Sequence, residues 1–414
     1  MKQWLQHTLE KLNLVTTMEQ PEGFTRLGYT DEEWEAMAAF TRIAEELGLT
    51  VTQDAAGNRI ARWETSENKH KPAVATGSHV DTVKYGGGYD GVAGVLCGLG
   101  AIKLLKQEGF NPLAPIEVIC FASEESSRFG ISTIGSKAMS GKLDVDTLAS
   151  VEDENGVTIK EAVESRRLTW ANVKSAERRS EDLASFVELH IEQGMRVERA
   201  KRDFGAVTAI ACPIRLVLHI EGKANHTGTT PMGQRQDALV AAAPIISFIS
   251  ERANELSEKS DLPIVATAST IELKPNVMTV IPGQLDLGID IRSVDDRLKE
   301  QLEEEIRDRC KQVEQRFDVT IDVEKLVHNP SVHLDMNVHD KLVSLGEELG
   351  LTSLTLESGA GHDVMNMAAK WSTGMIFIPC REGLSHHPNE HASIDDLYKG
   401  TTIITAYLRK ETGE

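Results

Sequence analysis

The chain has 414 residues and 40% of them are hydrophobic, so it is long enough to bury a full core and to divide into two domains. Acidic residues outnumber basic residues by 64 to 44, which gives a formal net charge of −20 and a pI near 5.2. This charge disfavours a partner with a phosphate backbone or an anionic membrane surface, so we expect no nucleic acid and no membrane as a partner.

The N-terminal stretch MKQWLQHTLEKLNLV contains His7, Glu10 and Lys11, and it therefore lacks the apolar region of a signal peptide. No charge-free apolar run along the chain reaches membrane-spanning length. The five cysteines are widely spread and form no Cys-x-x-Cys pair, which fits neither a disulfide framework nor a thiolate zinc site. We therefore expect a cytoplasmic protein.

The first element predicted along the chain is an amphipathic helix that begins after Thr30. Thr30 followed by Glu33 has the pattern of a capping box, in which the two side chains bond reciprocally to the first turn. Gly48 is expected to end the helix. Apolar residues recur at helical spacing between these limits: Trp34, Met37, Phe40, Ile43 and Leu47.

Four short apolar runs have the length and composition of strands and are separated by helical stretches. Such an alternation is typical of an α/β fold, with a mostly parallel central sheet covered by helices. The runs lie around Val74 and at residues 116–123, 186–189 and 374–379.

The stretch between residues 212 and 328 has a different order of helical and strand-like patterns. Two long helical patterns alternate there with four strand-like patterns in the order β-α-β-β-α-β, which is the ferredoxin-like split unit. Because the earlier pattern returns afterwards, we predict one domain from residues 1–211 and 329–414, with residues 212–328 inserted as a second domain.

Three glycines in GSHVDTVKYGGGYDG (77–91) match the G-x-G-x-x-G pattern of a dinucleotide site: Gly86, Gly88 and Gly91. That pattern requires the first glycine directly after a strand, whereas seven residues separate Ser78 from Gly86. A nucleotide pyrophosphate would also lie beside the like charge of Asp90. A dinucleotide site is therefore disfavoured.

The same stretch suits a metal site better. His79 supplies an imidazole, and Asp81 can accept the proton of its other ring nitrogen. The glycines allow a turn sharp enough to bring Asp90 back against His79. The alternative is a buried, hydrogen-bonded histidine beside a glycine turn, which is the more common case for an isolated His-x-Asp.

Further candidate ligands follow the other predicted strands, where ligands of open α/β sheets collect. Glu124 and Glu125 follow the second apolar run, His190 follows the third, and His386 lies in the loop after the last. Together with His79 and Asp90, this set predicts two divalent ions with one bridging carboxylate. We expect zinc or manganese, with cobalt or nickel as substitutes.

Eight stretches, in order over nearly the whole chain, resemble the N-carbamoyl-L-amino-acid hydrolase and allantoate amidohydrolase group. That group lies within the larger superfamily of carboxypeptidase G and the dinuclear aminoacylases. The stretches are GSHVDTVKYGGGYDG, ASEESSRFG, VELHIEQG, ANHTGTTPMGQRQD, KPNVMTVIPG, IDIRSVD, SGAGHD and GLSHHPNE.

The resemblance implies a catalytic α/β domain that binds two metals and a smaller lid domain that also dimerises. By matching motifs, His79 and His190 resemble the ligands of one metal, and Glu125 and His386 those of the other. Asp90 resembles the bridging carboxylate. The adjacent histidines of GLSHHP are distinguished only by this resemblance.

The resemblance also implies roles in catalysis. Glu124 matches the general base, and Asp81 matches the partner of the first ligand histidine. His226 resembles a residue that reaches across a homodimer to hold the developing oxyanion. Gln193, Asn276 and Arg292 match positions that grip the carboxylate of the substrate.

Taken alone, these last residues also have ordinary structural explanations: His226 as a loop histidine, Asn276 as a turn former, and Arg292 as a surface cation.

We therefore expect a hydrolase acting on a C–N bond other than a peptide bond. The expected substrate is a small anionic ureido acid, foremost an N-carbamoyl-L-amino acid, which would yield the L-amino acid, CO2 and NH3. Allantoate is the alternative substrate. A dipeptidase or N-acyl-amino-acid hydrolase and a non-catalytic metal-dependent binding protein are further alternatives, although a base beside the metals favours an enzyme.

Overall fold

The structure is a computed structural model that describes residues 1–413, and these residues form two compact units. The first unit comprises residues 1–208, 333–358 and 362–413, and the second comprises residues 209–332 and 359–361. All five cysteines are buried, and none of them forms a disulfide within residues 1–413. Within residues 1–413, no helix combines the length and the apolar character that crossing a membrane requires.

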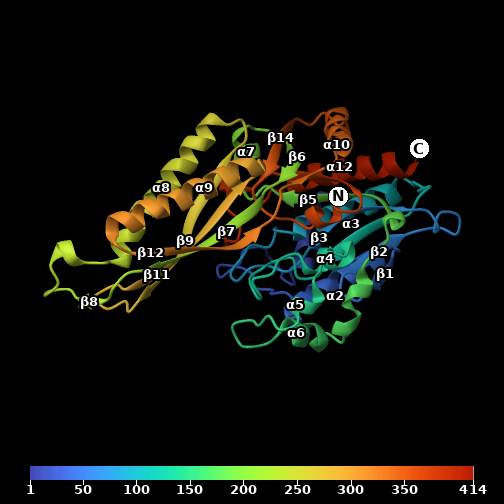
Figure 1. The fold of residues 1–414 in the computed structure, drawn as a ribbon. Coiled ribbons are helices and arrows are strands. Elements are labelled where there is room, and N and C mark those ends of the chain that lie inside the picture. The colour runs from blue at the N-terminus through green and yellow to red at the C-terminus, as the bar shows by residue number, and fades with distance from the viewer. Residues whose placement is uncertain (414) are drawn as a thin grey trace. The chain divides into compact units, whose positions relative to one another are not determined.

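A nine-stranded sheet forms the centre of the first unit, in the order β1-β2-β4-β3-β5-β15-β6-β13, with β14 paired to β6. Several of its strands, among them β3, β5 and β6, are labelled in Figure 1. The four central strands β4, β3, β5 and β15 are parallel, whereas β1, β2 and β6 pair antiparallel. The predicted α/β class is confirmed, and the parallel part is the centre of the sheet. The strands are β1 (Thr50–Gln53), β2 (Arg59–Trp63), β3 (Ala73–His79), β4 (Ile116–Phe121), β5 (Leu183–Ile191), β6 (Phe204–Ile210), β13 (Val332–His333), β14 (Ser353–Ser358) and β15 (Ser372–Ile378).

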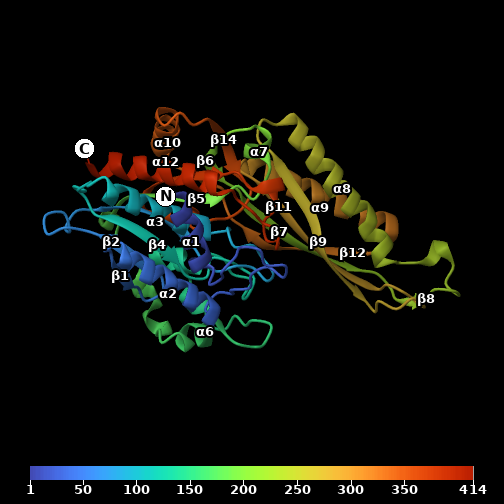
Figure 2. The same ribbon diagram turned by 180° about the vertical axis from the view of Figure 1, so that it is seen from behind.

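Helices cover this sheet, and the C-terminal helix α12 packs lengthwise against α3 (Figures 1 and 2). Both helices also contact the central strands β3 and β5. The α-helices are α1 (Lys2–Leu12), α2 (Asp31–Glu46), α3 (Val92–Gln107), α4 (Ile134–Ser140), α5 (Val145–Leu148), α6 (Ile159–Ser165), α7 (Arg196–Arg199), α10 (Met336–Glu348), α11 (Val364–Met367) and α12 (Ile394–Gly413). Three 3-10 helices are η1 (Trp170–Ala176), η2 (Ser180–Asp182) and η4 (Arg381–Gly383).

Strand β5 shows how the two faces of the sheet differ. Ser185 accepts the hydroxyl hydrogen of Tyr407 from α12, whereas Glu188 accepts the backbone N–H of Val364 at the start of α11. Because successive side chains of a strand point to opposite faces, His190 lies on the same face as Glu188. The sheet therefore directs His190 away from α12 and toward α11.

Helix α2 begins as predicted, because the Thr30 side chain accepts the backbone N–H of Glu33. The reciprocal half of the predicted capping box is wrong. The carboxylate of Glu33 accepts the backbone N–H groups of Tyr29 and of Ser123, which is 90 residues away. The Thr30 N–H donates to the carbonyl of Leu27 instead. The carboxylate of Glu33 is fully buried, and a long-range partner takes the place of the local one.

The second unit has the predicted β-α-β-β-α-β order. Its four-stranded antiparallel sheet runs β12-β7-β11-β9, and α8 and α9 lie along one face (Figures 1 and 2). The main elements are β7 (Cys212–Glu221), α8 (Ala238–Lys259), β9 (Ile264–Lys274), β11 (Gln284–Ser293), α9 (Asp296–Phe317) and β12 (Thr320–His328). A small ribbon of β8 (Asn225–His226) and β10 (Val280–Ile281) and the 3-10 helix η3 (Met232–Gln234) complete it.

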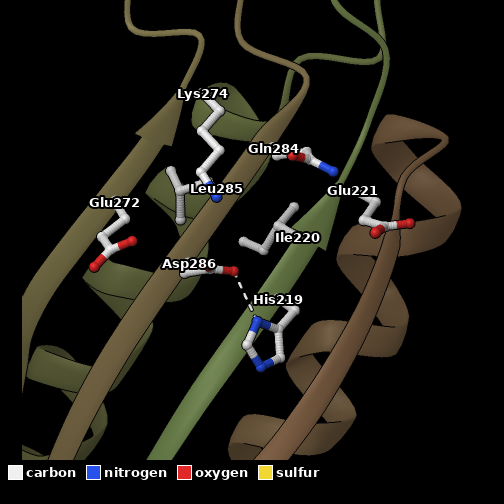
Figure 3. Close-up of a pocket in the computed structure, with 8 residues that line it drawn as sticks. All are labelled: His219, Ile220, Glu221, Glu272, Lys274, Gln284, Leu285 and Asp286. Carbon is white, nitrogen blue, oxygen red and sulfur yellow. Dashed lines mark hydrogen bonds and ion pairs between the residues drawn. The ribbon is translucent and has the colours of Figure 1, made fainter.

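The face of this sheet opposite to α8 and α9 is polar. Leu216 and Leu218 of β7 belong to the core under the helices, and His219 alternates to the other face. Its Nδ1 lies 2.7 Å from a carboxylate oxygen of Asp286 on β11. A dashed line in Figure 3 marks this contact. Its Nε2 lies 3.2 Å from Glu324 on β12. The imidazole therefore links three strands through two carboxylates.

Candidate metal centre

The five side chains predicted as metal ligands lie together in the first unit. His79, Asp90 and His190 form one group whose ligand atoms lie within 4.8 Å of one another. Asp90, Glu125 and His386 form a second group by the same measure. Asp90 is common to both groups, so the set has the composition of two adjacent sites that share one carboxylate.

The two oxygens of Asp90 face different partners. Its Oδ1 lies 2.9 Å from Nε2 of His190 and 3.6 Å from Nε2 of His79. Its Oδ2 lies 3.3 Å from Nε2 of His386, which in turn lies 3.1 Å from Oε1 of Glu125. This arrangement suits a carboxylate that binds one ion through each oxygen.

The two buried histidines present the same ring nitrogen to this centre. Nδ1 of His190 lies 2.8 Å from the carbonyl oxygen of Ile191, and Nδ1 of His79 lies 3.1 Å from that of Asp81. A carbonyl only accepts hydrogen bonds, so both rings carry a proton on Nδ1, and Nε2 is the ring nitrogen that each histidine turns toward Asp90. Imidazole nitrogens and carboxylate oxygens in this combination fit zinc or manganese.

The charges of the groups are strongly coupled. Burial alone would raise the pKa of Asp90, yet His190, His386 and His79 hold it well below its usual range. Burial raises the pKa of Glu124 well above its usual range, and Glu125 adds to this effect. Burial and the neighbouring carboxylate thus oppose ionisation of Glu124, whereas the three histidines stabilise the ionised form of Asp90.

Asp81 holds the loop that carries the two glutamates. Its Oδ1 accepts the backbone N–H of Glu124 at 3.0 Å, and its Oδ2 accepts that of Glu125 at 2.9 Å. Its Oδ1 also lies 3.3 Å from Nδ1 of His79, slightly farther than its own backbone carbonyl. Asp81 thus contacts His79 as expected, and its carboxylate also orients the glutamate pair.

Gln193 lies beside the shared carboxylate. Its Nε2 donates to Oδ2 of Asp90 at 2.7 Å and to the hydroxyl of Ser385 at 3.2 Å. The Ser385 hydroxyl donates to the same Asp90 oxygen at 2.9 Å. Within residues 1–413 the buried Oε1 of Gln193 has no hydrogen-bond partner.

The other three predicted residues belong to the second unit. His226 is exposed on β8, and its Nδ1 accepts the backbone N–H of Gly228 at 3.0 Å. Asn276 is exposed and has a φ of 55°. Arg292 on β11 donates to Asp290 at 2.7 Å and to the carbonyl of Gly359 at 3.0 Å.

Glu390 is a buried residue of this centre that the sequence did not single out. Its Oε1 accepts the backbone N–H groups of Tyr89 and Asp90. Its Oε2 accepts the backbone N–H of His386 and lies 3.3 Å from the hydroxyl oxygen of Ser385. Burial, followed by the charge of Asp90, raises the pKa of Glu390 to about 7. The only sequence signal was its position at the end of GLSHHPNE.

His362 is a second such residue. Its ring meets the ring of His190 edge-on at 4.5 Å between centroids, and its Nε2 lies 3.0 Å from the hydroxyl of Ser358. Burial, together with the charge of His190, keeps the pKa of His362 well below its usual range, so the ring is neutral. The SGAGHD stretch contributed to the resemblance, but its histidine had no assigned role.

Close packing explains two glycines of the 77–91 stretch. Gly91 has a φ of +65°, and a Cβ there would lie 2.5 Å from the ring of His79. A Cβ at Gly87 would lie 2.2 Å from a carboxylate oxygen of Glu390. These glycines are required by the side chains of the centre, with no nucleotide phosphate involved.

Residues 70–410 match the family model described as Peptidase family M20/M25/M40. The chain belongs to this family. It is 35% identical to an N-carbamoyl-L-amino-acid amidohydrolase of Paenarthrobacter aurescens, over 94% of this chain and 93% of that protein. It is 35% identical to a ureidoglycolate hydrolase of Arabidopsis thaliana, over 98% of this chain and 86% of that protein.

The fold agrees with the crystal structure of a hydantoinase/carbamoylase family amidase from Burkholderia multivorans. The TM-score is 0.88 at 28% identity, and the match covers 100% of this chain and 98% of that one. The resemblance described from the sequence is therefore confirmed. The expected enzyme class, a hydrolase acting on C–N bonds other than peptide bonds, is confirmed with it.

Proposed function

We propose that the protein hydrolyses the ureido C–N bond of a small ureido acid, with an N-carbamoyl-L-amino acid as substrate. The products would be the L-amino acid, CO2 and ammonia. The observation that carries this proposal is Asp90 shared between two histidine and carboxylate groups, with Glu124 buried beside them. The relative from Paenarthrobacter aurescens, named for this reaction, supports the choice of substrate.

Two divalent ions, zinc or manganese, fit the five ligand residues. His79 and His190 would hold one ion, Glu125 and His386 the other, and Asp90 both. When bound, such ions polarise a substrate carbonyl and lower the pKa of water.

Glu124 is the proposed general base. Its Oε2 lies 3.8 Å from Nε2 of His79, so it is next to the ligand groups without belonging to either. It would accept a proton from the attacking water and later give it to the leaving nitrogen. Its burial favours the protonated form between these two steps.

Gln193 is proposed to bind the ureido group rather than the carboxylate of the substrate. Its amide nitrogen is already engaged by Asp90 and Ser385, which leaves Oε1 as the available group. A carbonyl oxygen accepts hydrogen bonds, and a ureido group offers N–H donors.

The second unit is proposed to act as a lid and dimerisation domain that supplies further contacts. Nδ1 of His226 accepts an N–H, so the neutral ring carries its proton on Nε2 and can donate to an oxyanion of the partner's site. Arg292 is held in place by Asp290, and with Asn276 it would bind the substrate carboxylate.

Ureidoglycolate and allantoate are the alternative substrates, since each also combines a ureido group with a carboxylate. The match to the Arabidopsis thaliana ureidoglycolate hydrolase spans almost all of this chain at the same identity, and it favours testing that substrate with equal care.

The test is ammonia release from N-carbamoyl-L-amino acids, allantoate and ureidoglycolate by chelated protein, before and after addition of manganese, zinc, cobalt or nickel. We expect activity to return with metal on one substrate class. Glu124→Gln should abolish this activity and keep metal binding, whereas Glu125→Gln should weaken metal binding. Silence across the whole panel despite metal uptake would contradict the proposal and favour N-acyl or peptide substrates.

A further inference from the structure

Three successive backbone amides at the glutamate pair each donate to a buried carboxylate oxygen. Those of Glu124 and Glu125 bond to the two oxygens of Asp81, as described above. The preceding amide, that of Ser123, donates to Oε1 of Glu33 at 2.7 Å. The backbone that precedes and carries the proposed base and ligand is therefore held by two carboxylates from distant parts of the chain.

Glu33 stabilises backbone that would otherwise be unfavourable. Ser123 has a φ of 51°, and Tyr29, whose N–H donates to the other oxygen of Glu33, has a φ of 56°. Non-glycine residues rarely adopt this left-handed conformation, which persists only where the surroundings hold it. A single carboxylate thus holds two such residues, one of them directly before Glu124.

The residues around Glu33 help to keep its side chain in this position. Glu33 is fully buried at the first turn of α2, and the buried guanidinium of Arg26 supplies a positive charge near both Glu33 and Asp81. Arg26 is held in turn by the carbonyl of Val80, to which its Nε donates at 2.9 Å. Both Arg26 and Glu33 precede residue 70, where the match to the family model begins.

We propose that Glu33 is a positioning residue: through the amide of Ser123 it orients Glu124 and Glu125, so that the first acts on water while the second binds metal. The part that concerns Glu124 rests on the proposed function. The part that concerns metal retention by Glu125 rests only on the cluster of ligand groups.

The test compares Glu33→Gln with Thr30→Ala by Mn2+ titration calorimetry and by steady-state kinetics of the full chain. The side-chain amide introduced by Glu33→Gln has one accepting oxygen in place of two, so it cannot accept both N–H groups. The loop at Ser123 is then no longer held by this hydrogen bond. Thr30→Ala removes the cap of the same helix and leaves the Glu33 carboxylate in place. It is the control for simple destabilisation of α2.

For Glu33→Gln we expect the Kd of one manganese ion to rise about tenfold and kcat to fall about tenfold, with KM almost unchanged. Thr30→Ala should lower the melting temperature and leave the manganese Kd and kcat at their wild-type values. Equal metal affinity in Glu33→Gln and wild type, or the same loss in both variants, would overturn the proposal.

If Glu33→Gln does not fold, Glu33→Asp keeps the carboxyl group but is one methylene too short to hold both amides. It should show the same pattern at smaller amplitude, and wild-type metal affinity in this variant would also overturn the proposal. Because the calorimetry needs no substrate, failure of every ureido substrate would reject the proposed function and still leave this proposal tested.

Discussion

Glu390 and Asp90 are 300 residues apart in the chain, yet a carboxylate oxygen of Glu390 accepts the backbone N–H of Asp90 at 2.8 Å. The other oxygen of Glu390 accepts the backbone N–H of His386 at 3.2 Å. One buried side chain therefore sets the spacing between two candidate metal ligands, Asp90 and His386, that come from different loops. If both bind one ion as proposed, this spacing has to be maintained.

Glu390→Gln should weaken metal binding, because an amide cannot accept hydrogen bonds at both ends. We expect the Kd for manganese to rise about tenfold or more, which titration calorimetry measures. Glu382→Gln, an exposed glutamate of the same loop, is the matched control. Similar affinities in the two variants would show that Glu390 does not position the ligands.

The adjacent histidines His386 and His387 should behave differently. Nε2 of His386 lies 3.1 Å from Glu125, whereas Nδ1 of His387 accepts the backbone N–H of Asn389 in a local turn. His386→Ala should lose one equivalent of bound metal by elemental analysis, together with activity. His387→Ala should keep two equivalents, and the reverse result would reassign the ligand.

Gly91→Ala should displace the imidazole ring of His79 in addition to straining the backbone. A Cβ at Gly91 lies 2.5 Å from the imidazole ring, whereas one at Gly109, which also has a positive φ, has no atom of residues 1–413 within 4 Å. Each alanine should cost on the order of 1–3 kcal/mol of unfolding free energy, because both positions have a positive φ that a residue with a Cβ rarely adopts. Only Gly91→Ala should also lose metal affinity, as measured by calorimetry against Gly109→Ala.

His219 should titrate above the ordinary histidine pKa of 6.5, because Asp286 and then Glu324 stabilise its charged form. The ring proton NMR signal that disappears in His219→Gln reports this pKa. A folded pKa above the unfolded value gives stability that is fully present below about pH 6.5 and is lost as the pH rises through the folded pKa.

The stability effect of His219→Gln should accordingly be small and confined to low pH. The side chain is 38% exposed, so solvent screening limits the loss to about 0.5 kcal/mol of unfolding free energy. Urea unfolding at pH 6 and pH 9 compares the variant with wild type. A larger effect at pH 9 than at pH 6 would contradict the assignment.

Removal of divalent ions should lower the melting temperature, because an ion that binds only the folded chain stabilises it. At a free concentration of 100 times the Kd, each ion contributes about 2.7 kcal/mol. Differential scanning calorimetry with and without chelator measures this shift. A melting temperature independent of the chelator would argue against ion binding by the five ligand groups.

The fold class, the inserted β-α-β-β-α-β unit and a short set of candidate ligands could all be predicted from the amino-acid sequence. Periodicity reveals which faces of helices and strands are buried, and parallel strands end at one edge of a sheet. Side chains such as Glu125 and His386, which follow central strands, could therefore be expected to meet. The resemblance added a role for each candidate.

The groups that support those candidate ligands became evident only from the packed chain. The pattern of Thr30 and Glu33 predicted a local cap, yet the carboxylate of Glu33 bonds to Ser123. Glu390 and Gln193 likewise reach Asp90 across long stretches of chain. Local patterns describe bonds within one turn of a helix or strand. The partner of a buried carboxylate is set by which distant amides the packed chain leaves beside it.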